Sequence, residues 1–217
     1  MEKEKEKNFD MRFSKYFVVI SAISIASILI SNITSTKLFS IGSIVLPSSA
    51  LLFPITYIIG DIIAEVYGYK KARFVIMLGF ICNAFMILFF TLSIKLPPAS
   101  TWNNQEAYEL ILGTTPRMFI ASLTAFLFGS LSNAYVMDWL KKLTKEKKLW
   151  IRTIGSTIVG ELLDTLIFVF IGFGGLVSIN VILTMIICQF IWKVGYEIIA
   201  TPLTYLAINK YKKLEEK

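Results

Sequence analysis

The chain has 217 residues, of which 55% are hydrophobic and 17% charged, and its formal net charge is +7. A mean hydropathy of +0.67, with the apolar residues in long blocks, excludes an ordinary soluble domain and indicates an integral membrane protein. The basic residues stand at the ends of the apolar blocks, where they orient helices, so we expect a lipid bilayer and no nucleic acid as partner.

The chain contains no histidine, which removes HExxH metal sites, Ser-His-Asp and Cys-His nucleophilic systems and imidazole relays. Cys82 and Cys188 are isolated in apolar runs and match no zinc or disulfide spacing, so we interpret them as packing residues. We therefore expect no catalytic residues, no metal and no cofactor. An intramembrane enzyme that uses Asp and Glu as acid and base is the catalytic alternative, and no nucleophile paired with a base supports it.

Six apolar segments predict an all-α, polytopic membrane protein with six transmembrane helices in one bundle. Residues 1–15 are expected to form a cytoplasmic tail, residues 16–210 the transmembrane domain and residues 211–217 a second cytoplasmic tail. Because the number of segments is even, both termini face the same side. The segments cover about residues 16–36, 46–67, 73–95, 116–140, 150–171 and 178–208.

The distribution of basic residues indicates which side this is. Eighteen lysines and arginines lie in the tails and in the links that follow the second and fourth segments, whereas the opposite links contain three. By the positive-inside rule, both termini are predicted to be cytoplasmic. The one remaining basic residue, Lys193, lies inside the last segment.

Small residues recur at four-residue spacing in three segments, which lets helix backbones approach closely. We expect the stripes of the fourth and fifth segments to pack inside the bundle. The stripe of the first segment could equally pack inside the bundle or face a partner protein. The three stripes are Ala121, Ala125 and Gly129; Ser156 and Gly160; and Ala22 and Ala26.

Nine polar residues inside the apolar segments form the candidate solute-binding site. A charged residue at a helix centre costs about 2.5–3.5 kcal/mol on insertion scales, so we expect the ionisable ones to converge inside the bundle. Asp61 and Glu65 lie nearer the cytoplasmic end, where gating, ion coupling or an interfacial contact with Arg73 are alternatives. The nine residues are Asn32, Asp61, Glu65, Glu161, Asp164, Gln189, Lys193, Tyr196 and Glu197.

This set of side chains suits a small planar heterocycle, because a carboxylate accepts two parallel N–H bonds while an aromatic face stacks on the ring. A purely structural role, such as a Lys193–Glu197 pair along one helix, is the alternative. The residues alone indicate a small transporter for a polar or cationic solute. The predicted flat walls are Phe53, Tyr57, Phe168, Phe190, Trp192 and Tyr196.

Four blocks in the first, second, fifth and sixth segments carry a family resemblance. The most specific is FPITYIIGDIIAEVYGYKKAR from Phe53; the others are SNITSTK from Ser31, RTIGSTIVGELLDTLIF from Arg152 and KVGYEIIATPLTYLAINKYKK from Lys193. Together they resemble the bacterial queuosine precursor transporters, which are related to the vitamin-uptake components of energy-coupling-factor systems. The resemblance implies a multi-pass protein of the bacterial inner membrane that imports 7-cyano- or 7-aminomethyl-7-deazaguanine for salvage into tRNA queuosine.

With this substrate, Glu161 or Asp164 is expected to accept the N–H groups of the guanine-like edge. Lys193, or one of the side-chain amides, donates to the carbonyl, and Glu197 orients Lys193. The main alternative is the substrate-binding S component of an energy-coupling-factor transporter for another small vitamin or nucleobase. In that case the stripe of the first segment docks a coupling transmembrane partner.

Overall fold

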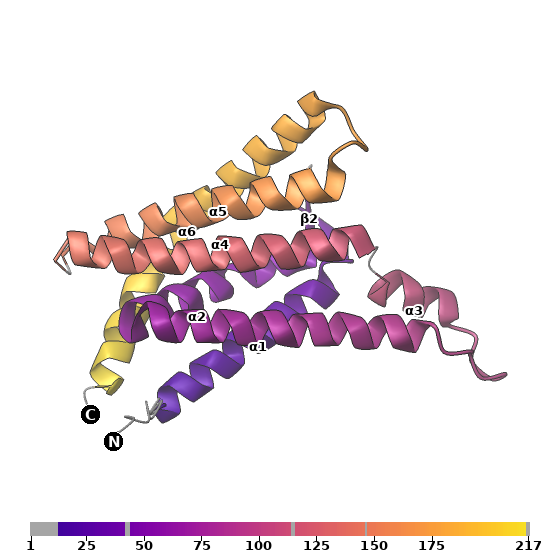
Figure 1. The fold of residues 1–217 in the computed structure, drawn as a ribbon, viewed down its shortest axis with the longest axis horizontal. Coiled ribbons are helices and arrows are strands. Elements are labelled where there is room, and N and C mark those ends of the chain that lie inside the picture. Colours follow the sequence, from indigo (N-terminus) through magenta and orange to yellow (C-terminus); the bar gives the residue numbers. More distant parts are fainter. Residues whose placement is uncertain (1–12, 42–43, 114–115, 146, 216–217) are drawn as a thin grey trace, which may run out of the picture.

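The computed structural model describes residues 13–41, 44–113, 116–145 and 147–215, and it is mainly helical, as predicted (Figure 1). Residues 1–12 of the predicted N-terminal tail lie outside the described part. A two-stranded antiparallel hairpin, which the sequence did not predict, follows the first helix. In chain order the elements are helix α1 (Lys15–Thr34), strands β1 (Leu38–Ile41) and β2 (Ile44–Pro47), the 3₁₀ helix η1 (Ser48–Leu51), and helices α2 (Phe53–Ile94), α3 (Gln105–Leu112), α4 (Pro116–Leu143), α5 (Leu149–Phe173) and α6 (Ile179–Glu215).

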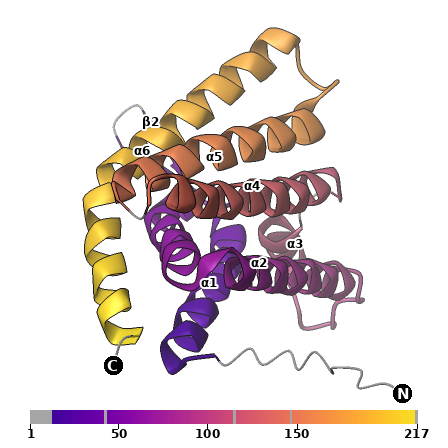
Figure 2. The ribbon, with the colours of Figure 1, turned by 60° about the vertical axis from the view of Figure 1, so that its left-hand side comes forward.

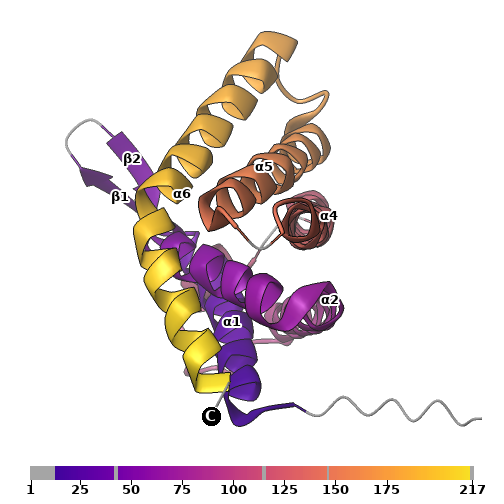
Figure 3. The same ribbon diagram turned by 90° about the vertical axis from the view of Figure 1, so that its left-hand side faces the viewer.

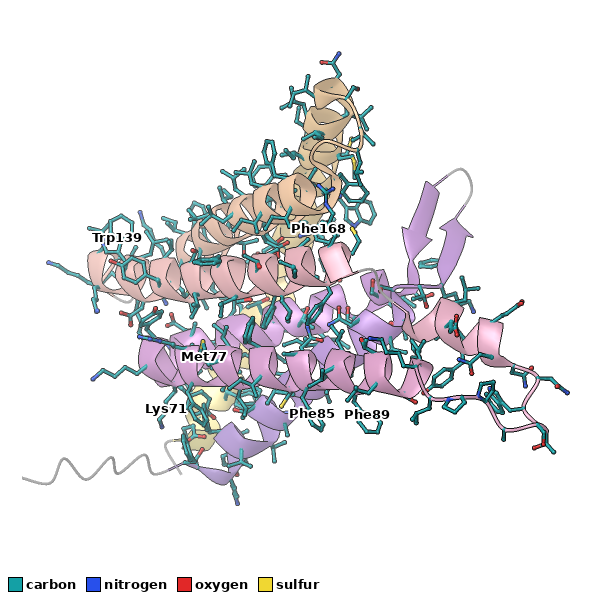
Figure 4. All side chains as sticks on the ribbon, turned by 45° about the vertical axis from the view of Figure 1, so that its right-hand side comes forward. Lys71, Met77, Phe85, Phe89, Trp139 and Phe168 are labelled. Atoms are coloured by element: carbon teal, nitrogen blue, oxygen red, sulfur yellow. The ribbon has the colours of Figure 1, made fainter. Side chains whose placement is uncertain are left out.

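Within the described residues, five helices are long and apolar enough, by length and composition, to cross a membrane. Their outer surfaces carry large apolar side chains. Phe85 and Phe89 of α2, for example, are 68% and 60% exposed and point away from the bundle (Figure 4). Extended apolar surface of this kind suits a lipid environment and marks the chain as a multi-pass membrane protein.

Helix α2 is broken at Gly68. The residue has φ 78° and ψ 170°, a non-helical conformation that glycine adopts at little steric cost. The chain reverses direction at this point, so residues 53–67 and 69–94 run in opposite senses (Figure 1). The break falls between the apolar segments that the sequence predicts at 46–67 and 73–95.

Both ends of the described chain lie at the same end of the bundle as the Gly68 break and the α4–α5 connection (Figure 1). Ser14 Oγ and Tyr67 OH both donate to Glu215 Oε1, at 2.5 and 2.7 Å. These bonds tie the start of α1 and the end of α6 to α2. Helix α6 continues to Glu215, so most of the stretch 211–217, which was predicted as a tail, is helical.

Helices α4 and α5 cross at two facing glycines. A Cβ added at Gly129 would lie 2.7 Å from Asp164 Cβ, and one added at Gly160 would lie 2.7 Å from Asn133 Cβ. Side chains at either glycine would therefore separate the helices, which confirms the predicted packing of these two stripes. The other residues of both stripes are also buried: Ala121, Ala125 and Ser156.

Gly160→Ala is expected to lower the thermal stability of the protein. The new methyl group would also approach Gly129 O to 3.0 Å, and overpacking of this kind costs about 1–3 kcal/mol. Gly195→Ala in α6 is the matched control, because nothing lies within 4 Å of a Cβ there. Melting of the two purified variants in detergent measures the difference, and equal melting temperatures would contradict the close crossing.

Helix α6 is bent, as Figures 2 and 3 show. Pro202 lies inside it and lacks the N–H that would bond to the Ile198 carbonyl, and its ring crowds the preceding turn. The first part of α6 runs beside α5, and the last part packs against α2 and α1 (Figure 3). The bend thereby brings Glu197, which is fully buried, into the interior of the bundle.

Candidate functional site

A cavity of about 870 Å³ lies between the helices. Pockets for small molecules and cofactors typically measure about 300–1,000 Å³, so this volume suits one small solute. The wall is largely apolar, with polar side chains contributed by each of five helices. They include Asn32 from α1, Asn83 from α2, Asn133 from α4, Glu161 from α5 and Lys193 from α6.

The charged part of the wall consists of Lys193 and two carboxylates of α5. Lys193 Nζ lies 2.8 Å from Glu161 Oε2 and 2.5 Å from Asp164 Oδ2. Residues three apart share one face of a helix, which explains why both carboxylates reach the same ammonium. One positive charge faces two negative ones, so the wall has an excess of hydrogen-bond acceptors and favours a solute rich in N–H donors.

Side-chain amides extend this polar wall. Gln189 lies one helical turn before Lys193 on α6 and also lines the cavity. Asn32 Nδ2 donates to Asn83 Oδ1 at 2.8 Å, which links α1 to the second part of α2. The cavity therefore offers both donors and acceptors to a solute.

Two of the predicted aromatic walls line the cavity, Phe168 of α5 and Trp192 of α6; Phe168 is marked in Figure 4. Phe190 and Tyr196 are not among the lining residues. The side chains of the other two predicted walls lie outside the described structure: Phe53 and Tyr57.

Glu65 lies outside this cavity, in a cluster of charges at the end of the bundle that holds both termini. Its buried carboxylate accepts hydrogen bonds from Arg152 Nε and Nη2 at 3.0 and 2.8 Å and from Lys212 Nζ at 2.9 Å. Arg152, which is 1% exposed, also donates to Thr144 Oγ1 and to the Lys147 carbonyl. The cluster joins α2, α5 and α6 at one point.

Sequence reasoning missed the partners of Glu65. Arg152 and Lys212 were counted only as charges that orient helices, and Arg73 was the partner considered for Glu65. The position of Arg152 was a signal for a buried partner. The residue lies inside α5, three residues after the helix begins, and not in the link before it. Lys141 of α4 adds a further contact, because its Nζ donates to the Glu65 carbonyl oxygen at 2.6 Å.

Asp61 and Glu197 form a third polar group, which does not line the cavity. Their exposed fractions are 1% and 0%, and Asn133 forms a side-chain hydrogen bond with Asp61. Asp61 Oδ2 and both Glu197 oxygens have no hydrogen-bond partner among the described residues. The predicted Lys193–Glu197 pair is not observed, because Lys193 is held by the two α5 carboxylates instead.

Of the nine predicted site residues, five line the cavity, from α1, α5 and α6. Tyr196 is partly buried beside Glu197, and Asp61, Glu65 and Glu197 occupy the two other groups. In the described part of the chain, no group of three or more His, Cys, Asp or Glu side chains is arranged to hold a metal ion. The five cavity residues are Asn32, Glu161, Asp164, Gln189 and Lys193.

Comparison with known proteins assigns the family. A family profile described as "Putative vitamin uptake transporter" matches residues 47–207, well over half of the chain. The chain belongs to this transporter family. It is also 33% identical over 150 residues to a Bacillus subtilis (strain 168) protein named "Probable queuosine precursor transporter". That match covers 68% of the chain and 65% of the relative, so it spans slightly less than two thirds of the relative's length. No solved structure matches the chain.

The matched region of this transporter contains residues of all three polar groups. Eight of the nine predicted site residues lie within it, and Asn32 precedes it. Lys212, which pairs with Glu65, follows it. Membership of a transporter family implies transport of a small solute across the membrane rather than an enzymatic reaction.

Proposed function

We propose that this chain imports a queuosine precursor, 7-cyano- or 7-aminomethyl-7-deazaguanine, for salvage into tRNA queuosine. The observation that carries the proposal is the pair of cavity carboxylates held by a single lysine. The guanine-like edge of these bases presents a ring N–H beside an exocyclic amine, and the two oxygens of one carboxylate match that spacing. The relative named as a queuosine precursor transporter supports the same solute class.

Each part of the cavity has a role in this proposal. Lys193 balances one of its two carboxylates, Glu161 and Asp164, and the charge that remains accepts the N–H groups of the base. Asn32 or Gln189, or Lys193 itself, donates to the carbonyl, which stands next to the ring N–H on the same edge of the base. The two aromatic walls stack on the flat face of the heterocycle.

The proposal includes six membrane crossings with both termini in the cytoplasm of a bacterial cell. Helix α2 has 42 residues. At about 1.5 Å per residue it is about twice as long as the roughly 30 Å hydrocarbon core, so its two parts supply two spans. The lysine-rich end of the bundle, which holds both described chain ends, is the cytoplasmic one by the positive-inside rule (Figure 1).

The second candidate is an S component that binds the solute and depends on a transmembrane partner for uptake. The exposure of Ala22 and Ala26 favours it, because this stripe on α1 leaves a close-packing surface uncovered by the described chain. The two candidates differ in whether the chain alone supports uptake.

The test is the queuosine content of tRNA in a bacterial host that cannot make the precursor and lacks its own importer. Given a trace of 7-cyano-7-deazaguanine, the gene alone is expected to restore queuosine. Asp138→Asn is the control variant, because Asp138 lies at the far end of α4 in an ion pair with Lys142, and it should restore queuosine equally. Absence of queuosine with the protein in the membrane would contradict the proposal; restoration only alongside an energy-coupling partner would favour the second candidate.

A further inference from the structure

The buried acids Asp61 and Glu197 have no role in the cavity described above. They come from α2 and α6 and lie close enough for their charges to repel each other. Asp61 is also one helical turn from Glu65, and cavity-lining Gly60 directly precedes it. The pair therefore stands between the solute cavity and the charge cluster at the end of the bundle.

Hydrogen-bond acceptors dominate this position. The unpartnered buried atoms include Asp61 Oδ2, both oxygens of Glu197 and Asn133 Oδ1, all of which are acceptors when the carboxyl groups are ionised. The Asn133 amide donates a side-chain hydrogen bond to Asp61. Neither oxygen of Glu197 has a donor in the described part of the chain.

Lys193 and Arg152, the basic residues of the cavity wall and of the charge cluster, are already engaged with other carboxylates. Lys193, one turn before Glu197, binds Glu161 and Asp164 at 2.8 and 2.5 Å. Arg152 lies at 2.8 Å from Glu65. The groups around the pair on each packed element are Glu65 on α2, the neutral Asn133 on α4, Glu161 on α5 and Tyr196 on α6, and α1 has no charged residue after Lys15.

Two buried carboxylates whose charges repel each other cannot both remain ionised without a counter-charge, because the repulsion adds to the cost of removing each from water. A bound proton removes the repulsion and supplies a missing donor, since a protonated carboxyl group loses its charge and gains an O–H donor for a neighbouring acceptor. A divalent metal ion fits less well. Calcium and magnesium take about six to eight oxygen ligands, and the described residues include no group of three or more His, Cys, Asp or Glu side chains arranged to hold a metal ion.

We propose that Asp61 and Glu197 form a proton-binding site whose occupancy is coupled to solute binding in the cavity. The link is Glu161, which holds Lys193 in the cavity wall and acts electrostatically on Glu197. A solute that engages Glu161 changes the field at Glu197, and by linkage the proton changes solute affinity by the same factor. The proposal rests on the proposed import function and adds the inward proton gradient as its energy source.

The first test measures protonation without any solute. Infrared spectra of the transporter in liposomes at neutral pH are expected to contain the C=O stretch of a buried protonated carboxyl group. The double variant Asp61→Asn, Glu197→Gln should lose this band, and the control Asp138→Asn should keep it. Both changes keep side-chain size and remove buried charge, so the double variant should fold. A band that persists in the double variant would overturn the proposal.

The second test measures transport in the same liposomes. With an inward pH gradient, 7-cyano-7-deazaguanine is expected to accumulate above its outside concentration while an internal dye reports acidification. The double variant should lose accumulation and acidification but still exchange labelled for unlabelled base across the membrane. Accumulation that needs a sodium gradient at equal pH, or that persists in the double variant, would overturn the coupling.

The two tests separate this inference from the proposed function. If wild-type protein neither binds nor exchanges the base, the proposed solute is wrong and the coupling to it falls as well. The infrared band then tests the proton site by itself. Loss of the band in the double variant supports the site, and its persistence contradicts the site.

Discussion

Glu161→Gln is expected to weaken binding of 7-cyano-7-deazaguanine by about 10- to 150-fold while the protein folds and inserts normally. Glutamine keeps the shape of the side chain and removes the negative charge that accepts the N–H groups of the base. A hydrogen bond to a charged group contributes about 1.5–3 kcal/mol, and each 1.4 kcal/mol is about tenfold in affinity. Lys193 keeps its contact with Asp164 at 2.5 Å, so the link between α5 and α6 remains. Equilibrium binding of the labelled base to purified protein measures the change.

The control for this substitution is Asp138→Asn, which makes the same charge change outside the cavity. Asp138 pairs with Lys142 at 2.7 Å on one face of α4, and that lysine is 76% exposed. We expect unchanged affinity in this variant. Wild-type affinity in Glu161→Gln would contradict a substrate role for Glu161, and a melting temperature close to wild type would show that any loss of binding is local.

Much of the fold was predictable because it follows from rules that act along the chain. Apolar length predicts the helices, and four-residue spacing predicts that Gly129 and Gly160 face another helix. The structure places them against each other. The hairpin of β1 and β2 was not predicted, because two strands of four residues give too short a pattern to distinguish from a loop.

The pairing of charges was the part that the sequence could not specify. Spacing places Lys193 and Glu197 on one face of α6, which suggested a pair within the helix. The structure turns Lys193 towards α5, where Glu161 and Asp164 offer two carboxylates one turn apart. The faces that two helices present to each other depend on how each helix is rotated about its axis. Close contacts, such as the one between Gly129 and Gly160, fix this rotation.

Arg152→Met is expected to lower the melting temperature by about 6–20 °C. The substitution leaves the Glu65 carboxylate buried without its bidentate partner, and removal of one member of a buried pair costs about 3–5 kcal/mol. For a chain of this length, each kcal/mol shifts melting by roughly 2–4 °C. Lys212 remains at 2.9 Å, but its side chain is 37% exposed and hydrated, so it compensates only in part. Thermal melting of purified protein in detergent measures the shift.

The double variant Glu65→Gln, Arg152→Met is expected to melt at a higher temperature than Arg152→Met alone, because it also removes the buried charge that Lys212 balances only in part. Arg73→Met is the matched control, since Arg73 is exposed on α2 and its loss should leave melting unchanged. Melting of Arg152→Met at the wild-type temperature would contradict a stabilising ion pair. Failure of the double variant to recover stability would mean that the packing of the arginine stem, rather than its charge, holds α5 to α2. Recovery would show that the unbalanced charge of Glu65, rather than lost packing, causes the instability of Arg152→Met.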